Sequence, residues 1–153
     1  MTFLWAIGGK QFADLHLWLT EAAWCSLEVQ KEYCSQYDNR TDLGNKGAGE
    51  GFKFRGAGYI QVTGRRNYQA FADAMNDQEI VNQGADYVVK NYAWEAAGYW
   101  WQNNGMNAII DQGTSVREVT LKVNPGLIYN KKELDKQINE RGTYYNQTVG
   151  VFK

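Results

Sequence analysis

The segment Glu50–Tyr68 holds the polar residues of this chain whose spacing best suits the binding of a ligand. Its glycines let the backbone pass close to another group, and Gln61, Thr63 and Asn67 follow them. On a strand, Gln61 and Thr63 would point to the same face. This arrangement suits an extended neutral ligand with many hydroxyl groups. The alternative is a tight buried loop whose polar side chains satisfy its own backbone.

The same glycines do not form a known phosphate-binding pattern. The P-loop requires G-x-x-x-x-G-K followed by Ser or Thr, and this string does not occur. The dinucleotide fingerprint requires a third glycine where Gln61 stands. We therefore do not expect a nucleotide ligand.

Metal ligands and nucleophile–base pairs are scarce. His16 is the only histidine and stands among apolar residues, so the usual zinc sites and a Ser-His-Asp or Cys-His arrangement are not expected. We predict no metal and no cofactor. Cys25 and Cys34 are too few for a disulfide framework, and we favour free thiols over a bridge that would need the chain to fold back.

The length and composition indicate one compact domain over residues 1–153, which we expect to be a monomer. Hydrophobic residues make up 44% of the chain, which argues against disorder. The net charge of −1 argues against nucleic acid or an anionic membrane as the main partner, and no run of about 20 apolar residues is present. The N-terminus lacks a basic region and a cleavage site, so we expect a chain made in the cytoplasm without a signal peptide.

Helical periodicity predicts five helical stretches with irregular connections. They are Gln11 to about Glu32, Asn67–Met75, Ala85–Asn103, Ser115–Val123 and about Lys131–Tyr145. Ser115 and Glu118 form a capping box, and the helix that they begin should stop at Asn124 because Pro125 follows. On their apolar helix, Trp94, Trp100 and Trp101 are expected to pack in the core.

Two further segments complete the expected fold. Cys34–Gly51 is a long polar loop, and Tyr59–Val62 is a candidate strand. The fold class is therefore mainly α, with long loops and at most a small β element. Two helical lobes would leave a cleft between them as the natural ligand site.

Several segments in order resemble glycoside hydrolase family 19, the chitinases and their endolysin relatives. GFKFRGAGYIQVTGRRNY (Gly51–Tyr68) resembles the family signature, and YDNRTDLGN (Tyr37–Asn45) resembles a run of its bacterial and phage branch. NYAWEAAGYWW (Asn91–Trp101), VTLKVNPG (Val119–Gly126) and NERGTYYN (Asn139–Asn146) are similar to its later motifs. The resemblance implies a lysozyme-like fold and an inverting endo-glycosidase that acts on β-1,4-linked N-acetylated amino-sugar polymers.

An inverting glycosidase needs a proton donor and a second carboxylate that activates water. By motif position the acid is Glu21 and the base Glu32. Eleven residues of straight helix rise about 16 Å, whereas an inverting pair lies roughly 6.5–9.5 Å apart. Either the helix breaks near Leu27–Lys31, or another carboxylate such as Glu28 serves. Asp38 and Asp42 suit ion pairs with Arg40 or Arg55 better.

The resemblance also implies roles for the other site residues. Thr63 would hold the attacking water with the base. Sugar contacts would come from Gln61, Asn67, Tyr68 and Asn124, and Arg141 would brace the carboxylates.

Three positions depart from the family pattern. The family's His before the acid is Thr20, an Arg is Ala57, and a Gly is Pro125. The branch resembled favours peptidoglycan over chitin as the polysaccharide and suggests an antimicrobial, endolysin-like enzyme that acts at the cell wall. A catalytically silent glycan-binding domain is the alternative from another functional class.

Overall fold

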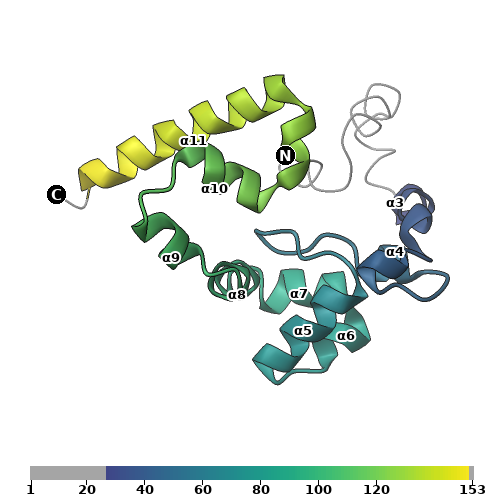
Figure 1. The fold of residues 1–153 in the computed structure, drawn as a ribbon. Coiled ribbons are helices and arrows are strands. Elements are labelled where there is room, and N and C mark those ends of the chain that lie inside the picture. Colours follow the sequence, from purple (N-terminus) through teal and green to yellow (C-terminus); the bar gives the residue numbers. More distant parts are fainter. Residues whose placement is uncertain (1–26, 152–153) are drawn as a thin grey trace. The chain divides into compact units, whose positions relative to one another are not determined.

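The computed structural model describes residues 27–151, and side chains from residue 30 to 147 (Figure 1). It confirms the mainly α fold class. Its β structure in the described residues is one antiparallel bridge between Ala57 and Val62. The chain divides into two compact units, Met1–Trp100 and Trp101–Lys153, with the boundary inside one helix. One domain over residues 1–153 stays a prediction.

The described part of the first unit consists of short helices joined by tight turns. Its α-helices are α3 (Leu27–Cys34), α4 (Glu50–Lys53), α5 (Arg65–Met75), α6 (Glu79–Gln83), α7 (Ala85–Asn91) and α8 (Glu95–Asn103), and its 3-10 turns are η1 (Ser35–Tyr37) and η2 (Thr41–Leu43). The 3-10 turns and the start of α4 lie in the segment that was expected to be a polar loop. The helices α5, α6 and α7 pack side by side.

The core of the first unit is built on one face of α5. Tyr68, Phe71 and Ala72 stand at helical spacing and are fully buried. The Tyr68 ring meets Phe54 edge-on at a centroid distance of 5.2 Å. The remaining members of this core come from the turns and from α6, α7 and α8: Ala57, Val62, Ile80, Val81, Ala85, Val88 and Ala96.

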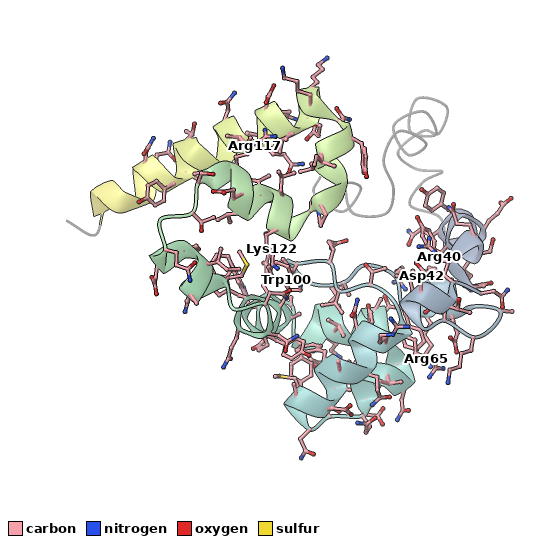
Figure 2. All side chains as sticks on the ribbon, in the orientation of Figure 1. Arg40, Asp42, Arg65, Trp100, Arg117 and Lys122 are labelled. Carbon is pink, nitrogen blue, oxygen red and sulfur yellow. The ribbon has the colours of Figure 1, made fainter. Side chains whose placement is uncertain are left out.

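The second unit contains α9 (Met106–Asp111), α10 (Val116–Val123), η3 (Pro125–Tyr129) and α11 (Lys131–Val151). The capping box is confirmed: Glu118 N donates to Ser115 Oγ at 3.3 Å, and Ser115 N donates to Glu118 Oε2 at 2.8 Å. The helix ends at Asn124 as expected. Arg117 and Lys122 stand on the same helix (Figure 2).

The predicted helix over residues 85–103 is wrong as one element, because the structure has two helices separated at Tyr92–Trp94. In a continuous helix the Ala97 amide would bond the Ala93 carbonyl. Here Ala97 N donates to Trp94 O at 3.0 Å, and Ala93 O accepts from Tyr59 N at 3.1 Å. A tertiary contact has therefore replaced a helical hydrogen bond. The short helices α6 and α9 were not predicted either.

The predicted core position of Trp94 is also wrong. This side chain is 70% exposed, because Trp94 lies in the break between α7 and α8 and so does not belong to the apolar face of either helix. Trp100 and Trp101 are half-buried.

No helix among residues 27–151 has the length and apolarity that crossing a membrane requires. The Cys34 thiol is free and buried, as favoured, whereas Cys25 and His16 lie outside the described residues.

The approach of Gly64 to Leu43 allows a direct test of packing. Gly64 has φ +87°, and a Cβ there would lie 2.8 Å from both Leu43 Cβ and Leu43 O. We expect Gly64→Ala to lower the free energy of unfolding by about 2–4 kcal/mol, because backbone strain and overpacking add. Chemical denaturation followed by circular dichroism measures the loss.

Substitutions at two other glycines separate the contribution of backbone strain from that of overpacking. Gly49 has φ +81° with open space around it, so Gly49→Ala should cost about 1 kcal/mol from strain alone. Gly47 has open space and no positive φ, and Gly47→Ala should change stability by less than about 0.5 kcal/mol. Equal losses at all three positions would contradict the packing argument.

Candidate functional site

The candidate site is built on a hairpin turn over residues 57–62, between α4 and α5. Val62 N donates to Ala57 O at 2.9 Å, and Ala57 N donates to Val62 O at 3.1 Å. Inside the turn Gln61 has φ +60°, a left-handed conformation that is uncommon for a residue with a side chain. The expected strand over residues 59–62 is therefore wrong, and the strand geometry that would place Gln61 and Thr63 on one face does not apply.

The polar side chains of the hairpin bond mainly to nearby backbone. Gln61 Nε2 donates to Gly58 O at 2.9 Å, and Thr63 Oγ1 donates to Gln61 O at 2.8 Å. Asn67 Nδ2 donates to Thr63 O at 2.8 Å. To this extent the tight-loop alternative is correct. One acceptor is left unsatisfied: Gln61 Oε1 is buried and has no hydrogen-bond partner among the described residues.

Thr63 lines a small cavity of about 40 Å³, which has room for ordered water. The other lining residues are Cys34, Tyr37, Leu43, Asn45, Gly51, Phe54, Arg55 and Gly56. The cavity thus joins the end of α3, the 37–45 run, α4 and the hairpin. Since Thr63 has committed its proton to Gln61 O, its oxygen can only accept a hydrogen bond from a molecule in this cavity.

One buried amide connects the 37–45 run with the start of α5. Asn45 is 1% exposed; its Nδ2 donates to Tyr37 O at 2.8 Å, and its Oδ1 accepts from Arg65 N at 2.9 Å. Both polar atoms of the buried side chain are therefore satisfied.

A two-point ion pair supports the same junction. Arg65 Nη2 and Nε lie 2.5 and 3.0 Å from Glu50 Oε1, and Nε lies 3.1 Å from Oε2. Lys46 N also donates to Glu50 Oε2, at 2.7 Å. The Glu50 side chain is only 15% exposed, so these contacts are well shielded from solvent. Hydrogen bonding from the Arg65 guanidinium lowers the pKa of the Glu50 carboxyl below its usual value.

Asp38 and Asp42 have structural roles in the described chain. Arg40 Nε donates to Asp42 Oδ1 at 2.7 Å, which confirms the expected pair; Figure 2 shows the two side chains together. Asp38 Oδ1 instead accepts from Gly51 N at 2.8 Å. Arg55 pairs with neither of them: its Nη2 lies 2.5 Å from Asp86 Oδ1.

The expected contact between Tyr68 and a sugar is not compatible with the structure. Tyr68 is fully buried, and its hydroxyl donates to Arg55 O at 2.6 Å. Burial raises the pKa of this phenol. Tyr68 therefore holds the backbone at Arg55, just before the hairpin. Its helical spacing from Phe71 and Ala72 is the sequence signal that could have predicted its burial.

The candidate carboxylates are only partly described. Glu21 lies outside the described residues. Glu32 is exposed on α3, which is continuous over Leu27–Cys34, so the break near Leu27–Lys31 that one of the two alternatives required is absent there. Glu28 precedes Glu32 by four residues on the same helix.

The remaining two candidates belong to the second compact unit. Asn124 is exposed at the end of α10, and Arg141 is half-buried on α11. Hydrogen bonds link Gln61, Thr63 and Asn67 in the first unit. Asn124 and Arg141 belong to the second unit. Within residues 27–151, no group of three or more His, Cys, Asp or Glu side chains could hold a metal ion.

The Glu50 pair predicts an acid-dependent loss of stability. Because the pKa of Glu50 is lower in the folded chain, its stabilisation is complete above the usual value of 4.5 and is lost as the pH falls through the folded pKa. Glu50→Gln should lower the free energy of unfolding by about 1–3 kcal/mol at pH 7, with a smaller loss once the pH falls below the folded pKa of Glu50. Denaturation at a series of pH values measures both.

Asp42→Asn is the matched control. Asp42 is also paired with an arginine, but both side chains are well exposed, at 60% and 46%. An exposed pair contributes little to stability, so this variant should unfold like the parent chain. A pH dependence unchanged by Glu50→Gln would contradict the assignment.

Comparison with known proteins finds a similarity to a glycosyl hydrolase. Over 96 residues the chain is 35% identical to a glycosyl hydrolase family 19 domain-containing protein of Haemophilus influenzae, which covers 60% of this chain. The chain spans 42% of the length of that protein. No family model matches the chain, and no solved structure matches it at a significant level. The similarity supports a relation to glycosyl hydrolase family 19 at the level of the family.

Proposed function

We propose that this chain is an inverting endo-glycosidase of family 19 that hydrolyses β-1,4-linked N-acetylated amino-sugar polymers, with peptidoglycan as the favoured substrate. The observation that carries the proposal is the state of the Thr63 hydroxyl. It lines a cavity with room for water and, having donated its proton to Gln61 O, can orient a water molecule only by accepting from it. The 35% identity to a family 19 domain-containing protein supports this chemistry.

In the proposed mechanism Glu21 protonates the leaving glycosidic oxygen while a carboxylate on α3 removes a proton from the attacking water. The water donates its second hydrogen to Thr63 Oγ1. Its oxygen lone pair then points toward the sugar carbon. Inversion follows because water attacks from the face opposite the leaving group.

We keep Glu32 rather than Glu28 as the proposed base, and the structure describes the helix that carries both. Cys34 at the end of α3 lines the Thr63 cavity. Along the helix axis Glu32 stands about 3 Å from Cys34, and Glu28 about 9 Å. Glu32 is exposed and stands two positions from the buried Cys34, so the two side chains lie on different faces of α3, and the choice of Glu32 rests on its position in the motif.

A catalytically silent glycan-binding domain is the competing function. Activity separates the two proposals: turbidity loss of cell-wall suspensions reports cleavage of peptidoglycan, and reducing-sugar release from chitin oligomers reports chitinase activity. Activity in the first assay also tests the proposed action at the cell wall. Binding of either glycan without cleavage would support the silent domain and overturn the enzyme.

Substitutions test the assigned roles. Glu21→Gln should lower the rate by about 10²–10⁴-fold, because the proton donor is lost. Glu32→Gln should have an effect of similar size and Glu28→Gln a small one; the reverse order would make Glu28 the base.

Thr63 offers a matched pair of variants. Thr63→Val removes the hydroxyl at nearly constant shape and should lower kcat by about 10²-fold, whereas Thr63→Ser should keep most of it. Equal rates for the two variants would show that the hydroxyl does not orient the water.

A further inference from the structure

Two aromatic side chains lie stacked and largely in solvent at the tip of the hairpin. The rings of Tyr59 and Trp94 have centroids 4.1 Å apart and planes inclined by 35°. They are nevertheless 64% and 70% exposed. Since each ring covers one face of the other, the exposed area must belong to the opposite faces and the edges.

The pair is held in place by the backbone. Tyr59 N donates to Ala93 O at 3.1 Å, which fixes the hairpin tip against the break between α7 and α8. The approach is close, because a Cβ on Gly58 would lie 3.0 Å from Ala93 O, and Gly58 has φ +70°. The two rings therefore form a preorganised surface, so binding a ligand to it would order few additional groups.

The polar ends of both rings are available. Within the described residues, neither the Tyr59 hydroxyl nor the Trp94 indole N–H makes a hydrogen bond. An aromatic ring offers an apolar face with negative π density, and its polar edge can exchange hydrogen bonds. A pyranose ring of a β-1,4-linked amino sugar presents C–H groups on its faces and hydroxyl or acetamido groups around its rim, which complements both properties.

We propose that Tyr59 and Trp94, the aromatic platform, form a binding subsite for one sugar ring of a β-1,4-linked amino-sugar chain. This inference rests on the proposed function for the class of ligand. Tyr59 of the platform lies on the same hairpin as Gln61, and Tyr59 and Thr63 are four residues apart, a span of at most about 14 Å. It would hold a sugar near the one that reacts.

Binding measurements on the full chain test the subsite. Isothermal titration with the N-acetylglucosamine hexamer, and with soluble glycan strands from peptidoglycan, would use Glu21→Gln as the parent so that the probe is not consumed. Trp94→Ala should raise the Kd about fivefold to tenfold, because one ring face removes roughly 50 Å² of apolar surface from water. Trp94→Phe should keep most of the affinity, and Tyr59→Ala should weaken binding severalfold.

Tyr129→Ala is the matched control. Tyr129 is 93% exposed in the second unit and has no ring partner in the described chain, so this variant should bind like the parent. Equal affinity of Trp94→Ala and the parent, or an equal loss in Trp94→Ala and Tyr129→Ala, would overturn the subsite. Failure of the parent to bind either probe would overturn it as well. Circular dichroism melting checks that each variant is folded.

Kinetics with an otherwise intact chain give a second readout. The platform should bind substrate and transition state equally, so Trp94→Ala should raise KM with kcat unchanged. A chain that binds glycan through the platform but does not cleave it would overturn the proposed hydrolase while supporting the subsite. The two failures are thus distinguishable.

Discussion

The two hydrogen bonds of the buried Asn45 amide are the constraint on which the candidate site depends. They join the Tyr37 carbonyl to the Arg65 amide, and so connect two segments that carry the resemblance to family 19. Loss of either partner would leave a buried polar group unsatisfied, at a cost of about 1–3 kcal/mol. The Glu50–Arg65 pair holds the same junction from its more exposed side. With this junction in place, Leu43 can pack directly on Gly64, and the hairpin before it has a defined position.

Sequence rules correctly predicted those helix ends that are determined by neighbouring residues in the chain. The α10 helix begins at a reciprocal Ser115–Glu118 cap and ends before Pro125, and both features are visible in a few consecutive residues. The break between α7 and α8 has no such cause, because no proline or glycine stands at Tyr92–Trp94. It arises where the Ala93 carbonyl accepts the Tyr59 amide, a partner 34 positions earlier in the chain. Periodicity alone could not reveal that competition.

The candidate site shows the same division. The sequence grouped Gln61, Thr63 and Asn67 on an assumed strand. In the structure Thr63 bonds to Gln61 and Asn67 to Thr63, but the left-handed conformation of Gln61 makes the strand geometry wrong. Such a conformation is set by the closure of the hairpin and by Gly58 packing on Ala93, which depend on tertiary contacts. Tyr68 was assigned to sugar contact by motif position, although its helical spacing with Phe71 and Ala72 indicated the core. Motif position predicted that Tyr68 contacts a sugar, whereas helical spacing predicted that it is buried. The structure shows Tyr68 fully buried.

The hairpin concentrates the unfavourable features of an otherwise well-satisfied unit. Gln61 combines a left-handed backbone, which costs about 1–2 kcal/mol, with a buried acceptor that has no partner. The exposed ring of Tyr59 stands two residues before Gln61, and it stacks on the exposed ring of Trp94 in the α7–α8 break. Strained backbone, an unpaired acceptor and exposed rings are each poor choices for stability alone, and they persist only where surrounding contacts determine them. Here those contacts are the Ala57–Val62 hydrogen bonds, the Tyr59–Ala93 hydrogen bond and the packing of Gly58 on Ala93. The contacts between the hairpin and the α7–α8 break thus hold a strained turn and an exposed aromatic pair in one fixed arrangement.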